Sequence, residues 1–199
     1  MYPPTAGGVS YIEAYKKMRR GILYMLVAPL LLLIIVYILL VAFSIAVVLV
    51  ILIIALLVPT VLFLLGLWGN FVPGVRRLGE LNVEFRTAST LVHLGFFWGV
   101  LLVIIGALTA PILIGFPILI IGAVLVLIGY IGLIILGFKL HDYEEDRLYL
   151  ATAITFIIGI VLPVLQIIGL ILLYVALGHS IKRHEALAQT PPSAPPTPV

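Results

Sequence analysis

Three long segments without a formal charge dominate the pattern of apolar and polar positions in this chain. Residues 21–75, 87–138 and 148–181 contain no Asp, Glu, Lys or Arg, and short charged segments separate them. An apolar helix of about 20 residues crosses a hydrocarbon layer about 30 Å thick, so such segments predict membrane-spanning helices. The pattern therefore predicts an all-α, polytopic transmembrane helical bundle.

Interruptions within these segments indicate where the helices end. Ser44 is the only polar break near the middle of the first segment, and two prolines and a glycine interrupt the second between residues 109 and 117. Pro163 divides the third segment into two short helices. We expect six helices in three hairpins, at approximately residues 21–43, 46–69, 91–110, 112–138, 148–162 and 164–181. One steeply tilted helix across the third segment would give five, and this alternative stays open.

The positions of Lys and Arg predict how the chain is oriented. Basic residues occur in residues 1–20, 76–86 and 139–147, whereas the expected turns at the other ends of the helices contain none. Cytoplasmic loops are enriched in these residues. We therefore expect a cytoplasmic segment at residues 1–20, a transmembrane domain at 21–181 and a disordered, proline-rich tail at 182–199. The charged loops and the N-terminus would face the cytoplasm of a multi-pass protein in the cell membrane.

Composition agrees with this class of protein. Hydrophobic residues make up 64% of the 199 residues and charged residues 10%, with a mean hydropathy of +1.35. The chain has no cysteine, which excludes thiolate metal sites, disulfides and thiol catalysis. Few Asn, Gln and Met residues are present, as is typical of proteins from thermophiles.

Glycine spacing predicts how two of the helices pack. Small residues allow close approach of helix backbones in lipid, where no hydrophobic force draws helices together. Positions seven apart fall on nearly the same face of a helix. We therefore expect the third and fourth helices to touch along glycines with these spacings, either within one chain or between copies: Gly95, Gly99, Gly106, Gly115, Gly122 and Gly129.

The polar stretch "HDYEEDR" at residues 141–147 is the main candidate for chemistry. His141 lies three residues before Glu144 and four before Glu145, so all three would share one face of a helix. Carboxylate oxygens there could hold a hard cation. The interpretation that we favour is a solvated connector between two helices that binds no metal. Gln166 is a further polar candidate, which could satisfy carbonyl groups freed by Pro163 or face another helix.

Other kinds of chemistry have little support in the sequence. His93 and His179 could bind haem only from matching depths, and we expect ordinary histidines at the membrane interface and no cofactor. No Asp, Glu, Lys or Arg falls inside an expected span, which argues against proton pumps and carriers of charged solutes. Motifs for hydrolases, metalloproteases and phosphate binding are absent from the sequence. We expect neither enzymatic activity nor nucleic-acid binding.

Two stretches together resemble a known protein family. They are "YKKMRRGILY" at residues 15–24 and "LGFKLHDYEEDRLYLATAITFIIGIVLPVLQIIGLILLYVALG" at residues 136–178. This combination is similar to an archaeal, largely crenarchaeal, family of multi-pass membrane proteins of unknown function, DUF973. The acidic run at 144–146 departs from that family, in which the connector is usually less acidic. The resemblance implies an archaeal plasma-membrane location and no particular activity.

These observations lead to three hypotheses for function. The first is a non-enzymatic integral membrane protein, a structural or accessory subunit that contacts lipids and associates with other membrane proteins or with itself. The second is a small channel or carrier for neutral or hydrophobic solutes. A redox protein with haem or a metal is the third.

Overall fold

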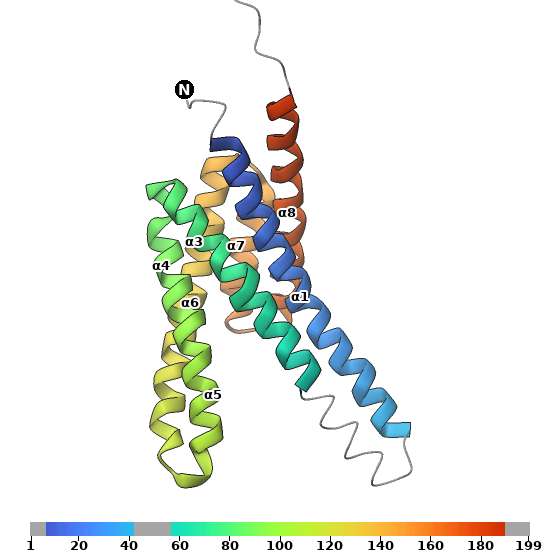
Figure 1. The fold of residues 1–199 in the computed structure, drawn as a ribbon, viewed down its shortest axis with the longest axis vertical. Helices are drawn as coiled ribbons and strands as arrows, with labels where there is room; N and C mark the ends of the chain where they lie inside the picture. Colours follow the sequence, from blue (N-terminus) through green and yellow to red (C-terminus); the bar gives the residue numbers. More distant parts are fainter. Residues whose placement is uncertain (1–6, 42–56, 190–199) are drawn as a thin grey trace, which may run out of the picture.

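A computed structural model describes residues 7–41 and 57–189 of the chain. Within these residues the protein is all-α, and six helices form a bundle (Figure 1), as the sequence predicted. The first is α1 (Gly7–Val41), and the second runs from Leu57 to Leu81 and includes η1 (Leu65–Phe71) and α3 (Val72–Leu81). The third, Val83–Thr109, comprises η2 (Val83–Phe85), α4 (Arg86–Val92), η3 (His93–Gly99) and α5 (Val100–Thr109). The last three are α6 (Gly115–Glu144), α7 (Arg147–Gly159) and α8 (Val164–Gln189).

Several helices extend beyond the apolar segments that predicted them. α1 begins at Gly7, before the apolar segment that starts at residue 21, α6 continues to Glu144, and α8 continues to Gln189, into the expected tail. Hydropathy identifies only the apolar part of a helix. Backbone hydrogen bonds and ion pairs stabilise the helix beyond that part. Such ion pairs are Lys16 with Glu185 at 2.7 Å and Arg77 with Glu13 at 2.5 Å. The turn expected at residues 42–46 and the end of the tail lie outside the described residues.

The turn expected at residues 109–117 lies within the described residues. α5 ends at Thr109, the short η4 (Ala110–Ile112) follows, and α6 begins at Gly115. Leu113 has a left-handed backbone conformation, with φ 65° and ψ −27°. Pro111 lies at the start of η4, where a missing amide costs no helical hydrogen bond. The chain reverses within the range that the prolines and glycine predicted.

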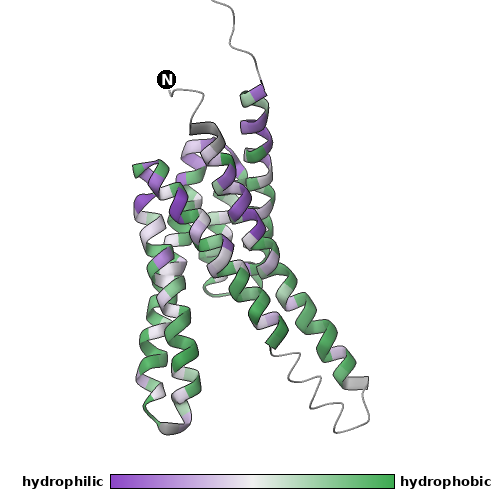
Figure 2. Ribbon diagram, viewed as in Figure 1, coloured by the Kyte–Doolittle hydropathy of each residue, from purple (hydrophilic) through white to green (hydrophobic). Residues whose placement is uncertain are grey.

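The bundle is closed at one end and open at the other. α1 and the 57–81 helix form one leg, α5 and α6 form a second, and the two legs diverge away from the end where α8 terminates (Figure 1). Hydrophilic residues gather at the closed end, which we call the polar end (Figure 2). The largest fully buried side chains include Tyr15, Phe85, Leu140, Tyr149 and Leu177. The packed core therefore lies in the closed half, and the legs extend from it.

α7 is shorter than the other helices. Its 13 residues span about 20 Å, less than the roughly 30 Å of a hydrocarbon layer. Residues 160–163 form the turn to α8, and this turn lies partway along the bundle rather than level with the tips of the legs (Figure 1). The five other helices are long and apolar enough to cross a membrane. Six helices and five candidate spans therefore coexist in this fold.

Candidate functional site

A buried carboxylate occupies the polar end of the bundle. Glu144, the last residue of α6, is only 4% exposed. Its Oε1 accepts a hydrogen bond from the Tyr15 hydroxyl of α1 at 2.7 Å and lies 2.9 Å from Nε2 of His184 on α8. A carboxylate oxygen only accepts, so Nε2 of His184 carries the proton in this contact. The side chain of Glu144 therefore joins three helices that are far apart in sequence.

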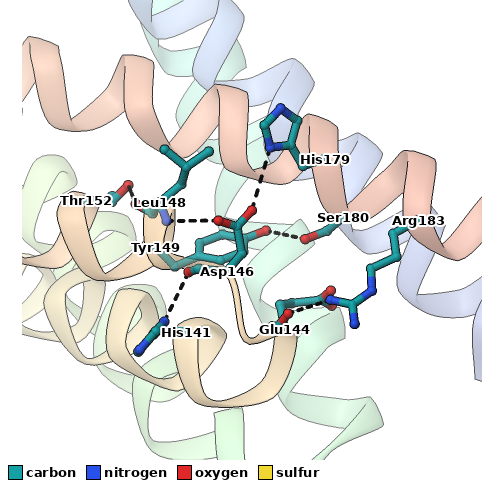
Figure 3. Close-up of polar contacts among 9 residues, drawn as sticks. All are labelled: His141, Glu144, Asp146, Leu148, Tyr149, Thr152, His179, Ser180 and Arg183. Carbon is teal, nitrogen blue, oxygen red and sulfur yellow. Dashed lines mark hydrogen bonds and ion pairs between the residues drawn. The ribbon is translucent and has the colours of Figure 1, made fainter.

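Further contacts enclose this carboxylate. The Arg183 Nη1 donates to the backbone carbonyl of Glu144 at 2.6 Å (Figure 3). The Tyr11 ring stacks on the His184 ring at 6.3 Å between centroids and on the Tyr143 ring at 5.6 Å. Isolated buried charges are costly, whereas a carboxylate with several donors is tolerated. The arrangement stabilises the polar end and leaves Glu144 sheltered from solvent.

The rest of the acidic stretch forms the reversal between α6 and α7. Glu145 has φ 54° and ψ 25°, and its amide donates to the carbonyl of His141 at 2.8 Å. The Asp146 carboxylate accepts from the Leu148 amide at 2.9 Å and so caps the N-terminus of α7 (Figure 3). His141 Nδ1 lies 3.0 Å from the carbonyl of Asp146 and must donate to it. The stretch is a capped turn, in the place where the sequence predicted a connector.

Two further polar contacts hold α8 against this turn. The hydroxyls of Tyr149 and Ser180 lie 2.8 Å apart in the interior, and Asp146 Oδ2 lies 3.6 Å from Nδ1 of His179 (Figure 3). His179 carries a charge in this second contact only when it is protonated. Together with the Glu144 contacts, these interactions fix the polar end of α8 relative to α6 and α7.

The structure separates the four polar residues that the sequence singled out. His141 and Glu144 both lie in the last turn of α6. The His141 side chain contacts the carbonyl of Asp146, whereas the Glu144 side chain contacts Tyr15 and His184. Glu145 is exposed. Gln166 lies beside the α7–α8 turn, where its Nε2 donates to the carbonyl of Gly159 at 3.2 Å. These residues do not converge on one ligand site.

Side chains satisfy the carbonyls that the α7–α8 turn leaves without helical donors. Proline has no amide hydrogen, so Pro163 cannot donate to the carbonyl of Gly159, four residues earlier. Gln166 takes that place. The Tyr130 hydroxyl of α6 donates to the carbonyl of Phe156 at 3.1 Å. Away from water an unpaired carbonyl is costly, so these two side chains make this turn possible inside the apolar part of the bundle.

An apolar crevice lies beside the same turn, between the two legs. Its volume is about 440 Å³, which is within the usual range for pockets that bind small ligands. The crevice reaches from the first leg across to α8, and Tyr130 and Gln166 are its polar members. The other side chains that define it include Met25, Phe71, Val126, Phe156 and Leu170. Because the polar tips of Tyr130 and Gln166 already bond backbone carbonyls, the crevice presents an apolar surface.

The six glycines identified in the sequence line the contact between the 83–109 helix and α6. A Cβ atom at Gly95 would overlap the backbone of Gly129. One at Gly99 would lie 2.7 Å from the Val126 amide nitrogen, and one at Gly122 would lie 2.7 Å from that of Val103. Gly106 and Gly115 approach each other near the tip of this leg. The second leg is therefore held by direct contact between backbones.

The two candidate haem ligands have unrelated surroundings. His93 stacks on Phe97 with 5.4 Å between ring centroids, whereas His179 approaches Asp146. Among residues 7–41 and 57–189, no group of three or more His, Asp or Glu side chains is placed to hold a metal ion.

Sequence reasoning did not identify the partners of Glu144. Tyr15 is 129 residues away and His184 is 40 residues away. No feature of the sequence connected Tyr15 or His184 with the acidic stretch. A local signal did exist for His184, since it follows the last apolar segment at a helix end and adjoins Arg183, but this signal indicates no particular partner.

The comparisons with known proteins agree with the resemblance seen in the sequence. No curated protein and no solved structure matches this chain. A protein-family profile described as "Protein of unknown function (DUF973)" matches residues 11–199, a range that includes Tyr15, Glu144, His184 and the α7–α8 turn. The chain belongs to the DUF973 family.

Proposed function

We propose that the protein is a non-enzymatic integral membrane protein that associates with another membrane protein, with the crevice between its legs receiving a transmembrane helix of that partner. The observation that carries this proposal is the divergence of the legs around an apolar crevice of about 440 Å³. In the most apolar stretches of the five candidate spans, only 17% to 39% of residues are buried within the chain. Much apolar surface is therefore left for lipid and for a partner.

The chemistry of the crevice favours an apolar occupant. Its two polar side chains, Tyr130 and Gln166, already donate to backbone carbonyls. Binding a polar solute there would compete with these hydrogen bonds and leave carbonyls unsatisfied. Van der Waals contact between apolar surfaces, which is how helices associate in lipid, requires no free polar group.

We assign the protein to the plasma membrane of an archaeal, thermophilic cell, with the polar end in the cytoplasm. The family resemblance supports the archaeal host, and the scarcity of Asn, Gln and Met supports a thermophile. Nearly all charged residues lie at the polar end or in the segments adjoining it (Figure 2), and enrichment of Lys and Arg supports a cytoplasmic side for that end.

Site-specific photocrosslinking in native membranes tests the partner proposal. A photoreactive phenylalanine analogue at Leu170 would lie in the crevice. The same analogue at Ile168 provides the control, because that exposed residue lies on nearly the opposite face of α8. We expect a discrete protein adduct from position 170 that is absent from position 168. Identical adducts from both positions, or no protein adduct from 170, would contradict the proposal.

A carrier for hydrophobic solutes is the second candidate, because the volume of the crevice also fits a small ligand. In this case position 170 would yield an adduct with the mass of a small apolar molecule rather than a protein band. The same crosslinking experiment therefore separates the two functions.

A further inference from the structure

The seam between α1 and α8 carries an arginine whose charge is not neutralised by any described residue. Arg19 of α1 lies over the Tyr174 ring, with Cζ 4.4 Å from the centroid, and no carboxylate among the described residues pairs with it. Its Nε is buried without a hydrogen-bond partner. Gly178 allows a close approach here, because a Cβ there would lie 3.3 Å from Arg19 Cζ. The guanidinium therefore lies against Tyr174 and Gly178 of α8.

Further cations lie along the same seam. Lys16 is one turn before Arg19 and pairs with Glu185 of α8 at 2.7 Å, while retaining half of its side-chain exposure. Lys182 is exposed, and it lies one turn after Gly178 and one turn before Glu185 on the same face of α8. Arg20 is exposed at the edge of this seam. Four cations therefore accompany a single carboxylate.

Apolar side chains continue the seam away from the polar end. Leu23 lies one turn beyond Arg19 on α1 and is 41% exposed. On α8, Val175 and Ile171 lie seven residues before Lys182 and Gly178 respectively, so each shares a face with its cationic or glycine neighbour. Both are about as exposed as Leu23. A cationic surface therefore lies next to an apolar surface along the seam. The head group and the hydrocarbon chains of a lipid are arranged in the same order.

We propose that this seam is a binding site for an anionic membrane lipid. Arg19, Lys182 and Lys16 contact the head-group phosphate, and Leu23, Ile171 and Val175 contact its hydrocarbon chain. Charge supports this occupant, because the excess of cations matches a phosphate. The Arg19 side chain is partly exposed and has no carboxylate partner among the described residues, so its charge is left for an anionic group. The site lies on the outer surface of the α1–α8 pair and does not depend on the crevice or its partner.

Native mass spectrometry of the purified full chain tests this site. The protein is titrated with phosphatidylglycerol and phosphatidylcholine that carry identical acyl chains. We expect preferential retention of phosphatidylglycerol, and binding about fivefold weaker for each cation removed in Arg19→Gln or Lys182→Gln. Phosphatidylcholine retention should not change.

Lys17→Gln provides the matched control, because Lys17 is an exposed cation on the same helix but on the side toward α3. Equal losses of phosphatidylglycerol in Lys17→Gln and Lys182→Gln would overturn the site. Undiminished binding in the Arg19→Gln/Lys182→Gln double variant would do the same. Displacement of the lipid by an excess of glycerol phosphate would show an anion site without a lipid requirement, which also contradicts the proposal. Because Lys182 is exposed, its variant keeps the test valid should Arg19→Gln fail to fold.

Discussion

At the scale of single residues, Glu144 illustrates how a charge is accommodated in an otherwise apolar chain. Its side chain is almost inaccessible, yet Tyr15 and His184 contact the same carboxylate oxygen. Each of these donors would be left without an acceptor if the carboxylate were removed. Loss of an acceptor from buried donors usually costs more than the net contribution of the hydrogen bond itself.

Glu144→Ala should therefore lower the free energy of unfolding by about 1 to 3 kcal/mol, as leaving buried donors without an acceptor usually does. Denaturant or detergent titration of the purified protein measures this. Glu145→Ala is the control, since that neighbouring residue is exposed and its loss should change the stability by about 0.5 kcal/mol or less. Equal effects of the two substitutions would show that the Glu144 contacts contribute little.

The sequence predicted part of this residue-level picture. The stretch lies between two helices, where the sequence predicted a connector, but His141, Glu144 and Glu145 make separate contacts and Glu144 is buried rather than solvated. The sequence did not indicate which of these residues would be buried, because that depends on Tyr15 and His184 arriving from distant helices. For Gln166 the sequence left two roles open, and the structure shows the first of them, a hydrogen bond to the Gly159 carbonyl that Pro163 leaves without a donor.

At the scale of elements, the second leg depends on the absence of side chains. Gly122 of α6 faces the backbone of Val103 in α5. Backbone atoms of Val103 cannot make room for a side chain at Gly122 unless α5 and α6 move apart. The spacing of these glycines predicted the contact because it is a property of one helix at a time. Helix ends were less predictable, since ion pairs such as Lys16–Glu185 extend helices beyond the apolar segments.

Gly122→Ala should destabilise the protein by about 1 to 3 kcal/mol through overpacking. Gly69→Ala is the matched control, because a Cβ at Gly69 meets nothing within 4 Å. Replacing that exposed helical glycine should be neutral or should stabilise the helix by up to about 1 kcal/mol. Thermal unfolding of both variants distinguishes these outcomes, and a Gly122→Ala variant as stable as the native chain would contradict the close-packing argument.

At the scale of the whole molecule, the polar end and the tips of the legs should lie on opposite sides of a membrane. The short α7 and the turn at residues 160–163 return α8 to the polar end, so Ser180 and His184 of α8 lie beside the α6–α7 turn, and the helix extends beyond it (Figure 1). The sequence did not decide between five and six helices, because it did not show that one helix would end partway across the membrane. Nor did it predict the divergence of the legs, which depends on packing between hairpins.

Single cysteines test this arrangement without background, because the chain contains none. Cysteine in place of Glu84, Glu145 or Gln189 should react with a membrane-impermeant maleimide from one side only. Cysteine in place of Leu113 should react only from the other. Labelling of positions 145 and 189 from opposite sides would show that α7 fails to return the chain as the structure has it.

The distance in sequence between Tyr15, Glu144 and His184 also bears on how a cell makes this protein. Ribosomes deliver the chain from its N-terminus, so the acid emerges long after its tyrosine partner and well before its histidine partner. Until the last helix is synthesised, the carboxylate lacks one of its donors. A chain that ends before His184 would leave the Glu144 carboxylate without this donor and incompletely covered. Quality-control proteases could then reach a polar end that is packed in the full-length protein.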